Sequence, residues 1–81
     1  MMPLLLANDN KIHPIRRVSG TPEIKKHLEN LGFVAGGEVI VVSELAGNLI
    51  VNVKESRVGI DRILAQKVFV DGGETEGTRL S

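Results

Sequence analysis

The clearest structural signal in this chain lies in residues 28–53, which read LENLGFVAGGEVIVVSELAGNLIVNV. Leu28 and Leu31 are spaced to share the inner face of a helix. Gly32 follows where a helix ends in the left-handed conformation, which a residue without a Cβ atom tolerates. The stretch therefore predicts a helix that ends at this glycine and runs directly into extended chain.

The second half of this stretch predicts a β-hairpin. Residues 39–42 are a short β-branched run of strand length, and residues 49–53 have apolar side chains at the odd positions. Gly47-Asn48, between the two runs, indicates a tight turn. Because the loops are so short, we expect consecutive strands to be neighbours in a sheet.

The pattern of apolar residues predicts further strands on both sides of the hairpin. Pro14 falls inside one of them and has no N–H to donate, so we expect that strand to lie at an edge or to be bulged there. The expected strands are residues 4–7, 12–18, 38–44, 48–54 and 67–70, with residues 57–60 as a sixth short piece.

One helix, over residues 22–31, is expected to interrupt the strands. Thr21 can cap its first turn, Pro22 suits the first helical position, and Ile24 joins Leu28 and Leu31 in one apolar stripe. Short strands, tight turns and one helix predict a mostly β fold. We expect a small closed β-barrel of about five strands, because closure removes exposed sheet edges, with the helix inserted after the first long strand.

The order of these motifs resembles that of a known family. In sequence they are a strand and its glycine stop at 15–20, the helix ending in Leu-Gly, the hairpin, a short piece at 56–60, a helical turn around 63–65 and the run at 67–70. Over residues 4–70 the chain resembles the ferrous iron transport protein A (FeoA) family. The resemblance implies an SH3-like barrel that acts beside FeoB, a GTPase-linked ferrous iron transporter in the membrane.

Length and composition favour a single small cytosolic domain. The chain has 81 residues, equal numbers of acidic and basic side chains, and no cysteine. A domain without disulfides is typical of the cytosol, and the apolar run MMPLLLA is shorter than a signal peptide or a membrane helix requires. We expect one domain over residues 1–70, no membrane insertion, and a mobile tail over residues 71–81.

The sequence offers little for catalysis or for a resident cofactor. His13 and His27 have no predicted hydroxyl nucleophile nearby, and the glycines precede a strand, whereas phosphate-binding loops precede a helix. His27 and Glu23, four residues apart on the helix, form a candidate metal pair, but a solvated helix surface is the favoured explanation. We expect no enzyme activity, no cofactor, and at most adventitious divalent metal.

Nucleic-acid binding is also disfavoured by the sequence. The chain has only two aromatic residues, Phe33 and Phe69, and no net charge. A local basic patch could combine Arg16, Arg17, Lys25 and Lys26. The two arginines, however, are neighbours in a predicted strand, so they are expected on its opposite faces.

Protein–protein contact is the function that the residues favour most. Exposed apolar groups beside charged ones are typical of such surfaces. For Phe33 the alternative is that it packs the helix end onto the barrel. The candidate residues are Lys25, Lys26, Glu29, Asn30, Phe33 and Val34 on the helix and its exit loop, and Leu45 and Asn48 at the hairpin tip.

With the family resemblance, this predicts a non-enzymatic accessory or regulatory protein of ferrous iron uptake. It would contact the cytosolic portion of the transporter. The alternative is a metal-responsive regulatory module related to the SH3-like domains of iron-dependent repressors.

Overall fold

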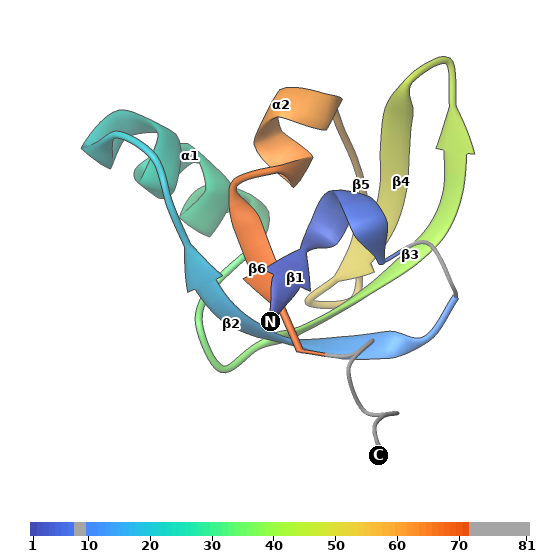
Figure 1. The fold of residues 1–81 in the computed structure, drawn as a ribbon, viewed down its shortest axis with the longest axis horizontal. Coiled ribbons are helices and arrows are strands. Elements are labelled where there is room, and N and C mark those ends of the chain that lie inside the picture. The colour runs from blue at the N-terminus through green and yellow to red at the C-terminus, as the bar shows by residue number, and fades with distance from the viewer. Residues whose placement is uncertain (8–9, 72–81) are drawn as a thin grey trace.

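The computed structural model describes residues 1–7 and 10–71, and this part of the chain forms one antiparallel sheet of six strands (Figure 1). The order across the sheet is β1-β6-β2-β3-β4-β5. In chain order the strands are β1 (Met2–Pro3), β2 (Ile12–Val18), β3 (Glu38–Leu45), β4 (Asn48–Val53), β5 (Ser56–Ile60) and β6 (Val68–Val70). Of the mobile tail expected over residues 71–81, only Asp71 is described, and its N–H donates to the Pro14 carbonyl at 3.0 Å, so the prediction is wrong for this residue; residues 72–81 lie outside the described residues.

Two α-helices and one 3₁₀ helix accompany these strands in the described residues, so the expectation of one helix is wrong. They are η1 (Leu4–Leu6), α1 (Pro22–Leu31) and α2 (Arg62–Ala65). The sequence predicted only a helical turn where α2 lies. The turn extends because Asp61 Oδ1 accepts a hydrogen bond from the backbone N–H of Leu64 at 2.8 Å, which caps the first turn.

The expected first strand, residues 4–7, is wrong. The strand β1 ends at Pro3, and the Ala7 N–H donates to the Leu4 carbonyl at 2.9 Å, which closes the 3₁₀ turn of η1. This turn separates side chains that a strand would place on one face. Leu4 is completely buried, whereas Leu6 is 68% exposed.

The sheet curls around its core, but the expected closed barrel is not what forms. Within the described residues, β1 and β5 lie at the two edges and pair with no further strand. The helices η1 and α2 occupy the concave side between the edges (Figure 1), where η1 contacts β6 and α2, and α2 contacts β4. Apolar side chains of η1 and α2 therefore cover core that a closed barrel would cover with strands.

The β3–β4 hairpin forms, but its turn lies one residue earlier than expected. A bulge between Val41 and Ser43 shifts the register, so that Leu45 pairs with Asn48. The two turn residues are consequently Ala46 and Gly47, both with positive φ. The pairing register, and not the Gly-Asn dipeptide, sets the position of this turn.

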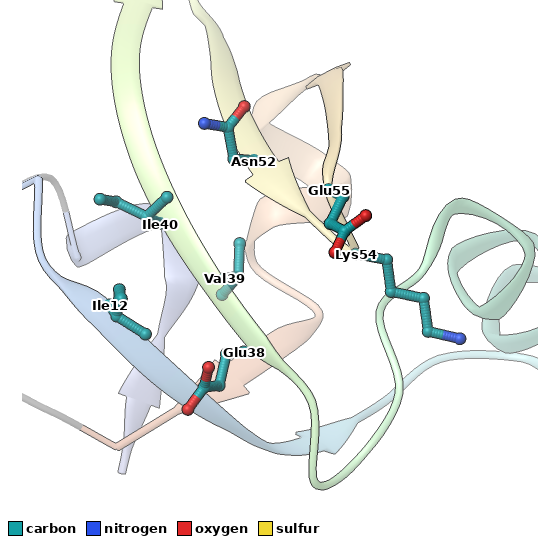
Figure 2. Close-up of a pocket in the computed structure, with 7 residues that line it drawn as sticks. All are labelled: Ile12, Glu38, Val39, Ile40, Asn52, Lys54 and Glu55. Carbon is teal, nitrogen blue, oxygen red and sulfur yellow. The ribbon is translucent and has the colours of Figure 1, made fainter.

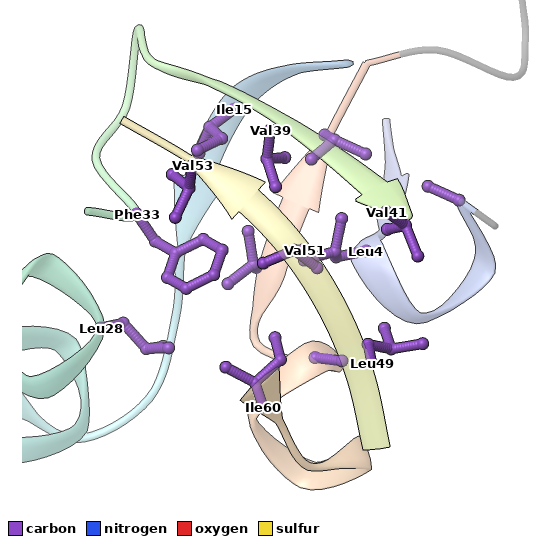
Figure 3. Packing of buried hydrophobic residues seen from close by; sticks show 14 residues of the cluster. Leu4, Ile15, Leu28, Phe33, Val39, Val41, Leu49, Val51, Val53 and Ile60 are labelled. Carbon is purple, nitrogen blue, oxygen red and sulfur yellow. The ribbon is translucent and has the colours of Figure 1, made fainter. Parts of the chain in front are cut away.

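The core lies between the concave face of the sheet and the helices (Figure 3). In β4 the predicted alternation holds, because Leu49, Val51 and Val53 all point inward. The predicted stripe of α1 also packs on the core, with Leu28 buried and Ile24 and Leu31 half-buried. The buried cluster comprises Leu4, Ala7, Ile15, Leu28, Phe33, Val39, Val41, Leu49, Val51, Val53, Ile60, Ala65, Val68 and Val70.

Candidate functional site

A groove of about 370 Å³ lies between α1, its exit loop and β2. It combines residues from elements that are separate in the sequence, and three of its lining side chains are basic. The groove is lined by Arg16, Arg17 and Val18 of β2, by Lys25 and Glu29 of α1, and by Phe33, Val34 and Ala35 of the exit loop. We call this surface the α1–β2 groove.

Helix α1 contributes Lys25 and Glu29 to the groove. Both ends of this helix are fixed by capping interactions. Thr21 Oγ1 accepts a hydrogen bond from the Ile24 N–H at 3.2 Å at the first turn. At the other end, Gly32 has a φ of +112°, and its N–H donates to the Glu29 carbonyl. The predicted helix, its cap and its glycine terminator are confirmed.

The exit loop lines the groove, and backbone hydrogen bonds join it to α1 on one side and to β2 on the other. The Phe33 N–H donates to the Leu28 carbonyl at 2.9 Å, completing the helix terminator and directing the phenyl ring into the core (Figure 3). Gly36 donates to the Ile15 carbonyl at 2.9 Å, and Ile15 donates to the Gly37 carbonyl at 2.8 Å. These bonds hold the loop against β2.

A bulge in β2 brings Arg16 and Arg17 into the same groove. The strand is interior, between β6 and β3, and its register against β6 shifts between Ile15 and Arg17, one residue after Pro14. The expectation that the two arginines are separated on opposite faces is therefore wrong. The extra residue of a bulge interrupts the alternation of a strand, so consecutive side chains no longer have to point to opposite sides.

Each arginine of the groove is held by a different interaction. The Arg17 guanidinium lies over the Phe69 ring, 5.0 Å from its centroid, which is within the range of a cation–π contact. Arg16 Nε lies 3.4 Å from Asp71 Oδ2. Among the described residues no carboxylate pairs with Arg17 or Lys25. The groove therefore offers fixed positive charge to a ligand.

The predicted partner-binding residues separate into three groups. Lys25, Glu29 and Val34 lie on the α1–β2 groove, and Arg16 and Arg17 join them although the sequence did not place them there. Lys26 and Asn30 are exposed on α1 outside the groove.

Phe33 and the hairpin tip differ most in exposure. Phe33 is only 1% exposed, so it does not offer an exposed apolar group, and the favoured alternative, that it packs the helix end onto the sheet, is confirmed. Leu45 is 69% exposed beside the exposed Asn48, as expected for the hairpin tip. Whether any of these residues contacts a partner stays a prediction.

A second hollow, of about 310 Å³, lies over β2, β3 and β4 beside the turn that joins β4 to β5 (Figure 2). Ile12 and Ile40 are apolar neighbours across the β2–β3 pair, and Ile12 is 64% exposed. Lys54 and Glu55 form the turn, and both have positive φ without being glycine. Its charged residues, Glu38, Lys54 and Glu55, are mainly acidic, whereas those of the α1–β2 groove are mainly basic.

The two histidines do not meet in a common site. His13 is 3% exposed, and its Nδ1 lies 2.8 Å from the Asp71 carbonyl oxygen, so this ring ties β2 to the end of β6. His27 and Glu23 are exposed on α1. Within residues 1–7 and 10–71, no three histidine or acidic side chains gather in a way that could hold a metal ion.

None of the helices in the described part of the chain has the length and apolar character of a membrane span. The longest of them, α1, has ten residues.

The fold is similar to several solved structures. The zinc complex of FeoA from Stenotrophomonas maltophilia, described as a prokaryotic SH3 domain protein, is 27% identical with a TM-score of 0.76, covering 88% of this chain and 91% of that one. An iron uptake regulatory protein (FeoA) is 23% identical with a TM-score of 0.80, covering 86% and 93%. ScaR with bound Zn²⁺ is 16% identical with a TM-score of 0.78, covering 88% of this chain and 36% of that one.

The sequence comparison agrees with the fold. No curated protein sequence matches the chain. A family model described as the FeoA domain, however, matches residues 2–72, which include every described strand and helix. This chain, with its SH3-like fold, belongs to the FeoA domain family.

Proposed function

We propose that this protein is a non-enzymatic accessory of ferrous iron uptake that acts in the cytosol. It would contact the cytosolic portion of a GTPase-linked, FeoB-like ferrous iron transporter. The observation that carries the proposal is the FeoA family match over residues 2–72. The S. maltophilia FeoA is itself described as a candidate activating factor of bacterial ferrous iron transport.

The mechanism that we propose is a shift in the transporter's conformational equilibrium. A bound protein favours the state for which it has the higher affinity, so docking can change the transporter's assembly or nucleotide cycle without any chemistry on the protein itself. The α1–β2 groove supports this proposal because Arg17 and Lys25, which have no carboxylate partner among the described residues, share it with apolar side chains. The placement of His13, with its Nδ1 at the Asp71 carbonyl, supports a structural role for that ring.

The test uses iron-limited cells from which the native gene has been removed. We expect ferrous iron uptake to fall and to recover when the tagged chain is expressed. Capture of the tagged chain from gently solubilised membranes should recover a GTPase-linked transporter, with the tag alone as control. Normal uptake in the deletion strain, together with capture that lacks the transporter, would contradict the proposal.

A second candidate function is that of a metal-responsive regulatory module. It is favoured by one observation, namely that two structures with this fold, the S. maltophilia FeoA and ScaR, were obtained with zinc. A ligand that binds only the folded state raises the melting temperature. We expect no change in the melting temperature when ferrous ion, zinc or a chelator is added. A rise with one metal that the chelator reverses would favour this second function.

A further inference from the structure

We propose that the α1–β2 groove binds an extended acidic peptide segment of a partner protein, with an apolar side chain inserted between the charges. This inference rests on the proposed function in treating the groove as the contact surface, and it adds the chemistry of the segment that binds there.

Charge is the first reason. The chain as a whole has a formal net charge of zero, yet Arg16, Arg17 and Lys25 face the groove with Glu29 as its only carboxylate. Arg17 and Lys25 lack carboxylate partners among the described residues, and Arg16 is the only one of the three with such a partner. A local excess of positive charge on a neutral protein steers and orients acidic ligands.

The apolar lining is the second reason. Four apolar residues line the groove: Val18 and Val34 are half-buried, Phe33 is buried and Ala35 is exposed. The volume of about 370 Å³ lies within the range of small ligand sites. An apolar side chain in the groove would lose its contact with water, while flanking carboxylates would remain at the charged rim.

Preorganisation is the third reason. Arg17 is held over Phe69, and the hydrogen bonds of Gly36 and Gly37 hold the exit loop on β2. Groups that are already ordered lose little entropy when a ligand binds. Asp71 competes with the ligand at one position, because it lies 3.4 Å from Arg16.

Other anionic ligands fit the groove less well. Single-stranded nucleic acids stack their bases on exposed aromatic rings, but Phe33 is buried and one side of the half-buried Phe69 is covered by Arg17. Anionic membranes are recognised by clusters of four to eight cations, whereas this groove has three and a glutamate. An acidic peptide with an apolar side chain offers groups that complement both the cations and the apolar residues of the groove.

The test uses two blocked synthetic peptides, Ac-EELEE-NH₂ and Ac-KKLKK-NH₂, added to the ¹⁵N-labelled full chain in NMR titrations. We expect saturable shift changes at the backbone amides of Lys25, Glu29 and Ala35 with the acidic peptide only. The shifts should weaken as salt is raised, because ions screen exposed charges.

Matched variants locate the binding within α1. Lys25→Glu changes a groove residue, and Lys26→Glu makes the same charge change on an exposed neighbour outside the groove. We expect Lys25→Glu to weaken acidic-peptide binding at least about threefold, and Lys26→Glu to weaken it clearly less. Asp71→Asn should strengthen binding, since it removes the competing carboxylate from Arg16 while leaving the backbone bonds of Asp71 available.

Several outcomes would overturn the inference. These are equal binding of both peptides, shift changes confined to the hollow of Figure 2, an equal loss in the two lysine variants, or binding to phosphatidylglycerol vesicles without binding to the acidic peptide.

The outcomes also separate this inference from the proposed function. If Lys25→Glu leaves capture of the transporter unchanged, the accessory function stands and the groove is excluded as its contact surface. If the acidic peptide binds the groove but no transporter is captured, the groove's specificity stands and the proposed function fails.

Discussion

The end of the molecule built by α1 and the tip of the β3–β4 hairpin look alike in sequence, because each places a large apolar residue beside a glycine and polar groups. In the structure they differ sharply. Phe33 is 1% exposed, whereas Leu45 is 69% exposed. Phe33 follows a helix terminator whose backbone bonds turn the chain toward the core, while Leu45 sits at the end of a two-residue turn. The exposure of an apolar residue thus depends on where its backbone directs it.

The largest expected effect is at Phe33. Phe33→Ala should reduce the free energy of unfolding by about 3–5 kcal/mol, because it leaves a cavity where α1 meets the sheet. Leu45→Ala, the matched change at the hairpin tip, should alter it by no more than about 0.5 kcal/mol. Chemical denaturation measures both. Similar losses of stability in the two variants would contradict the view that Phe33 is a core residue and Leu45 is not.

A smaller effect is expected at the two glycines next to these residues, Gly32 at the end of α1 and Gly47 at the hairpin tip. Gly32→Val should cost about 1–2 kcal/mol, because a β-branched residue resists a φ of +112°. A Cβ atom there would meet the side chain of Val53 at an ordinary 3.4 Å, so backbone conformation, not lack of space, causes the loss.

The matched control for this change is Gly47→Val. Gly47 has a φ of +85°, and a Cβ atom there would meet nothing within 4 Å. We expect a smaller loss in chemical denaturation, because a hairpin tip can distort without moving the core. An unchanged denaturation midpoint for Gly32→Val would show that this glycine is not required to end α1.

The next effect has the opposite sign and concerns the β4–β5 turn at the other end of β4. Lys54 and Glu55 have φ values of 51° and 64°, a conformation in which Asn-Gly is favoured. Replacing both (Lys54→Asn with Glu55→Gly) should raise the free energy of unfolding by up to about 1 kcal/mol in a thermal melt. A lower melting temperature would show that these side chains stabilise the turn through their contacts.

The smallest expected effect is on the exposed face of α1. Lys25→Glu combined with Lys26→Glu should change the free energy of unfolding by less than about 0.5 kcal/mol, because both side chains are exposed and lie outside the packed stripe. A thermal melt, with Leu45→Ala as the reference surface change, measures this. A large loss would mean that the cations of α1 maintain its structure, contrary to a role in binding.

Local signals in the sequence were sufficient to predict the bounds of α1, the inward face of β4 and the family. The bounds of α1 follow from the Thr21 cap and the Gly32 terminator, which act within one helical turn. The inward face of β4 follows from its alternation. Such features depend on residues a few positions apart, and they can therefore be inferred without knowing where the rest of the chain lies.

Only the tertiary structure decided the register, the edges of the sheet and the α1–β2 groove. The hairpin turn moved to Ala46–Gly47 because a bulge in β3 shifts the pairing with β4. Arg16 and Arg17 share a groove with Lys25 because a second bulge, against β6, interrupts β2. Pro14 indicated an edge or a bulge in β2, but the position of a bulge and the register beyond it depend on strand pairings over the whole sheet, so a short stretch of residues does not fix them.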